Sequence, residues 1–101
     1  MTLAVEISEE AEHDLEEVFD YTYSEHEMNQ TVEYVSSFDP VFQNLALNPQ
    51  LGRERMEIRE GLRCHVKDLH VIFYRIKSDC VRIVRVLHGA QDLAPHFAKN
   101  R

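Results

Sequence analysis

The sequence has few of the residues that would set it apart from ordinary globular proteins. Tryptophan is absent, and the 101 residues include only three glycines and three prolines. With 44% hydrophobic residues, this composition excludes a disordered or low-complexity chain. No apolar run approaches the ~20 residues needed to cross a bilayer, and no basic-then-apolar secretory signal opens the chain. We therefore expect one soluble domain spanning residues 1–101, with no membrane partner.

Cysteine is also scarce. The two cysteines, Cys64 and Cys80, are too few for a disulfide scaffold and lack the paired spacing of a zinc ribbon. If they lie on alternate strands of one sheet, about 10 Å separates them, which is too far for a disulfide. The cysteine content indicates packing roles and a reducing, cytoplasmic location.

Basic residues are missing from the whole first half of the chain. Residues 1–52 contain 12 Asp and Glu and no Lys or Arg, whereas residues 53–101 contain all 11 Lys and Arg and 6 Asp and Glu. The overall formal charge is -7, which argues against a protein that binds nucleic acid. The division predicts an acidic surface from the first half and a basic one from the second.

The first half has the periodicity of one short strand followed by two helices. Residues 2–7 alternate as a strand, and Ser8 is placed to cap a helix that runs to about His26. Asn29 is placed to cap a second helix, which Asn48-Pro49 ends. Pro40 falls inside this helix and favours a kink, with a restart capped by Asp39 as the alternative.

After Gly61 the period becomes that of strands. Residues 62–67, 70–77 and 80–88 are rich in Val, Ile, Phe and Tyr, and short turns separate them. They predict a three-stranded meander whose last strand is interior, and Asp92 is placed to cap a short C-terminal helix through Phe97. We expect an α+β, two-layer β-α-α-β-β-β fold, with a helical hairpin on a mainly antiparallel four-stranded sheet.

Several segments resemble the ParE toxins of the RelE/ParE superfamily. They are Glu57–Arg63 (EIREGLR), His70–Arg75 (HVIFYR), Ile83–Gly89 (IVRVLHG), Ser8–Glu12 (SEEAE) with Asp14-Leu15, and Leu45-Ala46 before Asn48-Pro49. The resemblance implies a toxin of a type II toxin–antitoxin module that interferes with DNA gyrase, so that cleaved DNA accumulates. It further implies neutralisation by a ParD-like antitoxin in a hetero-oligomer. It implies no cofactor, no bond chemistry and no sequence-specific nucleic-acid binding by the toxin alone.

The basic residues of the second half are the candidates for binding an acidic target. They are Arg53, Arg55, Arg59, Arg63, Lys67, Arg75, Arg82 and Arg85. Arg82 and Arg85 sit on the strand expected to be buried, which favours ion pairs with the acids of the first helix. Alternation places Arg63, His65 and Lys67 on one face of a strand. The residues proposed to touch the target are Arg59, Arg63, His65, Lys67, His88, Asp92 and Phe97.

The histidines raise two further hypotheses. His88 precedes Gly89 at the end of a strand. Its imidazole could act as a general acid or base, or form a hydrogen bond that holds the turn, and we favour the structural role. His65, His70 and Cys64 lack a recurring ligand spacing and are expected on different strand faces, so we predict no metal site.

Two alternative functions stay open. RelE-type relatives cleave messenger RNA with clustered basic residues and a C-terminal tyrosine, but no tyrosine follows Tyr74 here and no Lys or Arg lies between Arg85 and Lys99. His96 would have to move protons instead. The other alternative is a degenerate, non-toxic binding module or corepressor, suggested by Gln91, where relatives often have a basic residue, and by Pro40.

Overall fold

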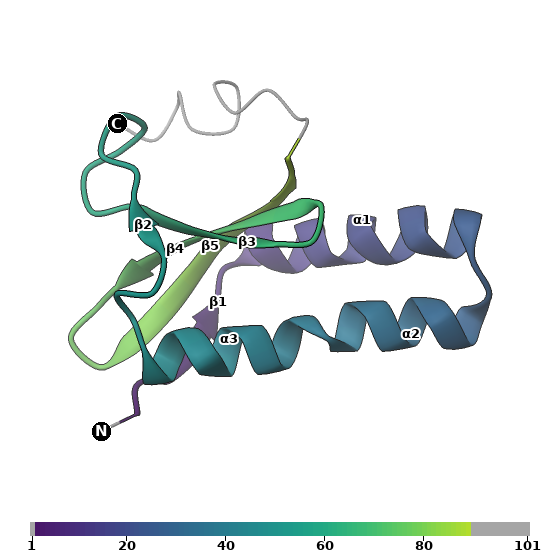
Figure 1. Cartoon of the computed structure of the whole chain (residues 1–101), viewed down its shortest axis with the longest axis horizontal. Helices are drawn as coiled ribbons and strands as arrows, with labels where there is room; N and C mark the ends of the chain where they lie inside the picture. The colour runs from purple at the N-terminus through teal and green to yellow at the C-terminus, as the bar shows by residue number, and fades with distance from the viewer. Residues whose placement is uncertain (1, 90–101) are drawn as a thin grey trace.

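The chain folds into a helical layer beneath a sheet. The computed structural model describes residues 2–89, and in this range three helices lie on one face of the sheet (Figure 1). The helices are α1 (Glu9–Glu25), α2 (Met28–Ser36) and α3 (Phe38–Leu47). Helices α2 and α3 follow each other along α1, and the α1–α2 end extends beyond the sheet (Figure 1). The expected α+β class with a helical hairpin on a sheet is confirmed.

Within residues 2–89 the sheet has five strands rather than the expected four. They are β1 (Ala4–Ile7), β2 (Arg53–Glu54), β3 (Arg63–Lys67), β4 (His70–Ile76) and β5 (Cys80–His88), in the order β1-β5-β4-β3-β2. Only β1 and β5 pair in parallel, and β5 is interior as expected. The addition is β2, two residues of the expected loop, which pair with Cys64 and Arg63 at the sheet edge. A pairing this short gives no periodicity to read in the sequence.

Helix α1 begins where the sequence predicts. Ser8 is its N-cap, and its hydroxyl accepts a hydrogen bond from the Ala11 amide at 3.0 Å. The same hydroxyl donates to the Val84 carbonyl on β5 at 2.8 Å. One side chain therefore caps the helix and ties its start to the sheet.

The second predicted helix is two helices, and this corrects the expected kink. Ser37 ends α2 and serves as the N-cap of α3, so Pro40 is the third residue of a new helix. Proline is tolerated there because the first-turn amides have no partner within the helix. The start of α2 also differs from the prediction: Glu27 is the N-cap, in a capping box with Gln30, and Asn29 lies inside the helix.

The core divides between the two faces of the sheet. The larger cluster joins the helices to the sheet through residues such as Phe38, Phe42 and Ile83. On the opposite face, Leu62, Cys64, Phe73 and Leu87 form a smaller cluster, with Ile58 from the preceding loop against it. Cys64 and Cys80 are buried free thiols, as expected. Within the described range, no helix is long and apolar enough to span a membrane.

Candidate functional site: a groove over His70 and His88

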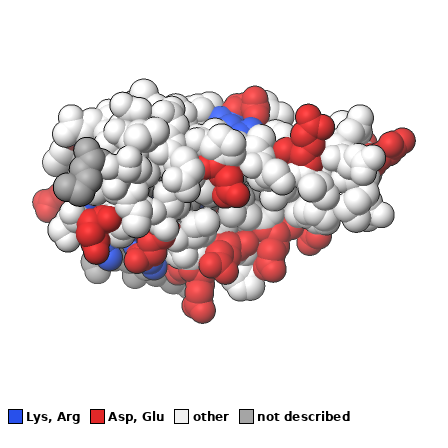
Figure 2. All heavy atoms as spheres, turned by 90° about the horizontal axis from the view of Figure 1, so that it is seen from below, with Lys and Arg blue, Asp and Glu red and all other residues white. Residues whose placement is uncertain are grey.

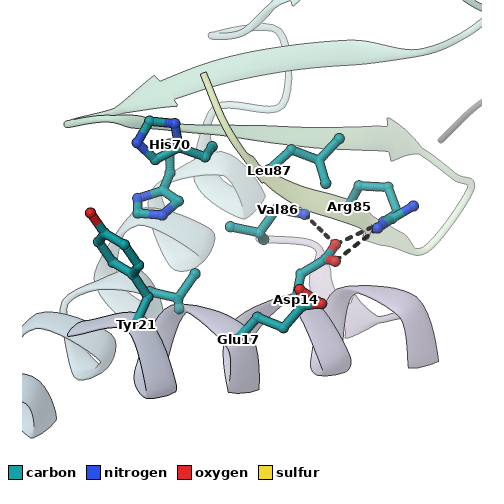
Figure 3. Close-up of a pocket in the computed structure, with 9 residues that line it drawn as sticks. Asp14, Glu17, Tyr21, His70, Arg85, Val86 and Leu87 are labelled. Atoms are coloured by element: carbon teal, nitrogen blue, oxygen red, sulfur yellow. Dashed lines mark hydrogen bonds and ion pairs between the residues drawn. The ribbon is translucent and has the colours of Figure 1, made fainter. Parts of the chain in front are cut away.

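A hollow lies between α1 and the ends of β4 and β5. It has a volume of about 370 Å³ and continues into a second hollow of about 530 Å³ beneath α2 and the β3–β4 turn. Tyr21, His70 and His88 line both parts. In Figure 3, Asp14, Glu17 and Tyr21 rise from α1 toward the sheet, and His70 faces them from the other side. We call the two connected hollows the His70–His88 groove.

One end of the groove is held by a buried ion pair. Asp14, 5% exposed, accepts two hydrogen bonds of 2.8 Å from Arg85 through Nε and Nη2. Its Oδ2 also accepts the Val86 backbone amide at 2.9 Å. The hydrogen bonds that Arg85 donates to Asp14, followed by the negative charges of Asp14, Glu10 and Glu17, raise the pKa of Arg85. The Arg85 guanidinium is therefore a structural partner of α1, as the sequence favours.

A break in strand pairing explains why Asp14 is needed. The β1 pairing ends at Ile7 opposite Ile83, and the register of β5 against β4 shifts at Phe73/Tyr74. Beyond this point β5 has no β1 partner, and Ser8 and Asp14 instead bond to its Val84 carbonyl and Val86 amide. Buried backbone groups need such partners, so α1 completes the hydrogen bonding of the sheet edge.

The floor of the groove is formed by aromatic and imidazole rings that contact one another. His70 lies edge-on to His88, with ring centroids 5.6 Å apart, and its Nδ1 is 2.9 Å from the Tyr34 hydroxyl on α2. Burial, followed by the positive charges that His88 and Lys67 can carry, lowers the pKa of His70. Burial also raises the pKa of Tyr34. Near neutral pH the His70–Tyr34 pair is therefore uncharged and holds α2 against β4.

The predicted row of Arg63, His65 and Lys67 does lie on one face of β3. Register pairs this row with His70, Ile72 and Tyr74, so it is the face turned toward the helices. Arg63 donates to the Gly52 carbonyl at 2.6 Å and pairs with Glu54 at 3.2 Å. Lys67, with its side chain 11% exposed, lies 4.5 Å from the Tyr34 ring centroid and pairs with Asp68 at 2.7 Å. Arg63 and Lys67 thus have partners within the fold, and target binding by this row stays a prediction.

The other predicted residues lie in different places. Arg59 is in the loop after β2, where burial, followed by the charge of Arg75, lowers its pKa. His88 lines the groove, and the neighbouring Gly89 amide donates to the Leu69 carbonyl at 2.8 Å. Asp92 and Phe97, with the predicted C-terminal helix, lie outside the described residues.

The metal hypothesis can be checked only over the described residues. Cys64 lies on the opposite face of the sheet from His65, as expected. His65 and His70 share one face, which differs from the expectation that these residues lie on different strand faces. Residues 2–89 contain no cluster of three or more His, Cys, Asp or Glu that could hold a metal ion.

Sequence reasoning did not identify Asp14, Tyr21, Tyr34 and Leu69 as a group. Tyr21 and Leu69 are 66% and 69% exposed, respectively, and both line the groove. A large apolar side chain that remains exposed on a helix is hard to distinguish from core by its spacing alone. The sequence did contain one signal: Asp14 directly precedes Leu15, a residue of the apolar stripe of the first helix, so an acidic side chain lies close to the buried side of that helix.

The fold is that of known toxin–antitoxin components. The structure of the chromosomal ParDE TA system from P. aeruginosa superposes with a TM-score of 0.75, covering 86% of this chain and 96% of that chain at 16% identity. In sequence, the Mycobacterium tuberculosis protein named Toxin ParE1 is 34% identical over 88 residues, which is 86% of this chain and 90% of the relative. Toxin ParE1 of Caulobacter vibrioides is 28% identical over 91 residues, 90% and 94% of the two chains.

Residues 5–93 match the family described as ParE toxin of type II toxin-antitoxin system, parDE. The chain therefore belongs to the ParE toxin family.

Proposed function

We propose that this toxin inhibits DNA gyrase by binding it and stabilising a complex with cleaved DNA, without bond chemistry of its own. Membership of the ParE family over residues 5–93 is the observation that carries the proposal. The target would be met in the cytoplasm, through the basic residues of the second half and the C-terminal segment. A ParD-like antitoxin would neutralise the toxin in a hetero-oligomer.

The electrostatics of the groove support binding over ribonuclease chemistry. The only guanidinium among its described lining residues is Arg85, and Asp14 neutralises it. The other groups that can carry charge among the described lining residues are the carboxylates of Glu17, Glu25 and Asp68 and the imidazoles of His26, His70 and His88. RNA cleavage needs cations near the phosphate and the developing charge, whereas this groove repels an anion.

The proposal is tested by a supercoiling assay with purified gyrase, relaxed plasmid and the full-length protein. We expect loss of supercoiling and the appearance of linear DNA after the gyrase is denatured, because a trapped cleavage complex then releases broken ends. Normal supercoiling at a large excess of folded toxin would refute the gyrase hypothesis.

A parallel translation reaction separates the alternatives. The gyrase hypothesis expects the messenger to stay intact, and cut messenger with unaffected gyrase would instead support the RelE-like hypothesis. Inactivity in both assays, with the antitoxin still bound, would support a non-toxic binding module.

A further inference from the structure

We infer that the His70–His88 groove binds a cationic, amphipathic segment of the antitoxin; this inference rests on the proposed neutralisation by a ParD-like partner. It assigns both the surface and the charge of the partner segment. The argument has an apolar part and an electrostatic part.

The apolar part comes from side chains that the fold leaves uncovered. Tyr21 on α1 is 66% exposed and Leu69 in the β3–β4 turn is 69% exposed, and both line the groove, over the His70 and His88 rings. Backbone geometry holds Leu69 in place, because Lys67 pairs with His70 across the turn and the Leu69 carbonyl accepts the Gly89 amide. Tyr21 and Leu69 thus expose apolar surface on two separate elements of one groove, and this surface can bind the apolar face of a docked segment.

The electrostatic part comes from the balance of charge along the groove. Four carboxylates line it: Asp14, Glu17, Glu25 and Asp68. Arg85 pairs with Asp14 and Lys67 with Asp68. For Glu17 and Glu25 the described residues provide no salt bridge, and both side chains are exposed. Two carboxylates that have no salt bridge within residues 2–89 lie two turns apart on the α1 wall, and they attract a segment that presents Lys or Arg beside its apolar face.

The side of the molecule that carries the helices is acidic as well (Figure 2). Figure 2, which views the molecule from below, shows carboxylates over most of the visible charged surface and few Lys or Arg side chains. An acidic segment would meet repulsion on approach and at the groove itself, whereas a basic one is steered toward it.

The experiment measures binding of the full-length toxin to its probe, the ParD-like protein encoded beside the toxin gene. The test variant is Glu17→Lys with Glu25→Lys. The control is Glu16→Lys with Asp20→Lys, which makes the same charge change on the same helix outside the groove. We expect the test variant to weaken binding by about tenfold or more and the control by no more than about twofold.

A second pair of variants tests the apolar part. Leu69→Ser removes a groove side chain, whereas Val66→Ser removes a similarly exposed apolar side chain, 64% against 69%, from the opposite face of the same hairpin. We expect only Leu69→Ser to weaken binding, by about fivefold to tenfold. Circular dichroism and thermal unfolding confirm that each variant is folded before its affinity is compared.

The outcomes separate this inference from the proposed function. If the wild-type toxin binds the antitoxin and both variants of each pair bind equally, the groove assignment is wrong while neutralisation stands. If the affinity rises with added salt, the assigned charge of the segment is wrong, since opposite charges are screened. Absence of any binding by the wild type would remove both the inference and the proposed antitoxin, and the gyrase assay would still be decisive for the target.

Discussion

At the scale of single residues, Asp14 connects the two layers of the fold most directly. It is a buried carboxylate on α1 that satisfies the Arg85 guanidinium and the Val86 amide on β5. Arg82 makes a contrasting pair: it contacts Glu6 on the edge strand β1, and both side chains are more than a third exposed. The same kind of salt bridge therefore occurs in a buried and in an exposed environment within one strand.

Replacing Asp14 with Ala should destabilise the protein by about 3 kcal/mol or more, because it leaves a mostly buried guanidinium and a buried amide without their acceptor. Replacing Arg82 with Ala should cost about 0–1 kcal/mol, since exposed ion pairs contribute little. Urea unfolding followed by circular dichroism measures both changes. Equal losses for the two variants would mean that Asp14 is not the structural tie described above.

At the scale of secondary-structure elements, the division between α2 and α3 matters most. Ser37 is shared between the helices, with a φ of -70° and a ψ of -9°, and Pro40 follows in the first turn of α3. A proline in a helix interior removes a hydrogen bond and costs about 3 kcal/mol, whereas one in the first turn costs little. Because α2 has already ended and Pro40 lies in the first turn of α3, the proline breaks no hydrogen bond of either helix.

Replacing Pro40 with Ala should therefore lower the free energy of unfolding by only about 0.4–1 kcal/mol, through the greater freedom of the unfolded chain. Chemical denaturation of the two proteins measures the difference. A gain in stability of about 3 kcal/mol would instead indicate that the proline strains a continuous helix, as the sequence-based expectation of a kink implies.

At the scale of the whole molecule, the acidic first half of the sequence produces an acidic helix α1. Among the described residues, Asp14 is the one carboxylate of this helix that forms a salt bridge with Lys or Arg, and it is buried. Like-charged pairs four residues apart, such as Glu12 with Glu16, oppose helix formation. The fold tolerates this repulsion.

Raising NaCl from about 50 mM to about 500 mM should increase the free energy of unfolding, because salt screens repulsion among the exposed carboxylates of the helical layer. The exposed salt bridges weaken under the same conditions, but each contributes little. Urea titrations at the two salt concentrations measure the change. A fall in stability with salt would show that attractive surface pairs outweigh the repulsion, which would weaken the electrostatic argument for the groove.

From the sequence alone we could predict the α+β class, the three long strands and the Ser8 cap, because these follow from local period and composition, which act over a few residues. The family was recognised separately, from the resemblance of short motifs along the chain. The Arg85 ion pair with the first helix was also foreseeable, because a buried arginine needs an acid and the first helix is rich in them.

Only the tertiary structure decided the identity of that acid, the additional strand β2 and the groove. Asp14 and Arg85 are 71 residues apart in sequence, and they meet because α1 packs against β5. His70 and His88 become neighbours only through the pairing of β4 with β5. Contacts of this kind depend on strand register and on how helices are placed over a sheet, and local periodicity does not specify either.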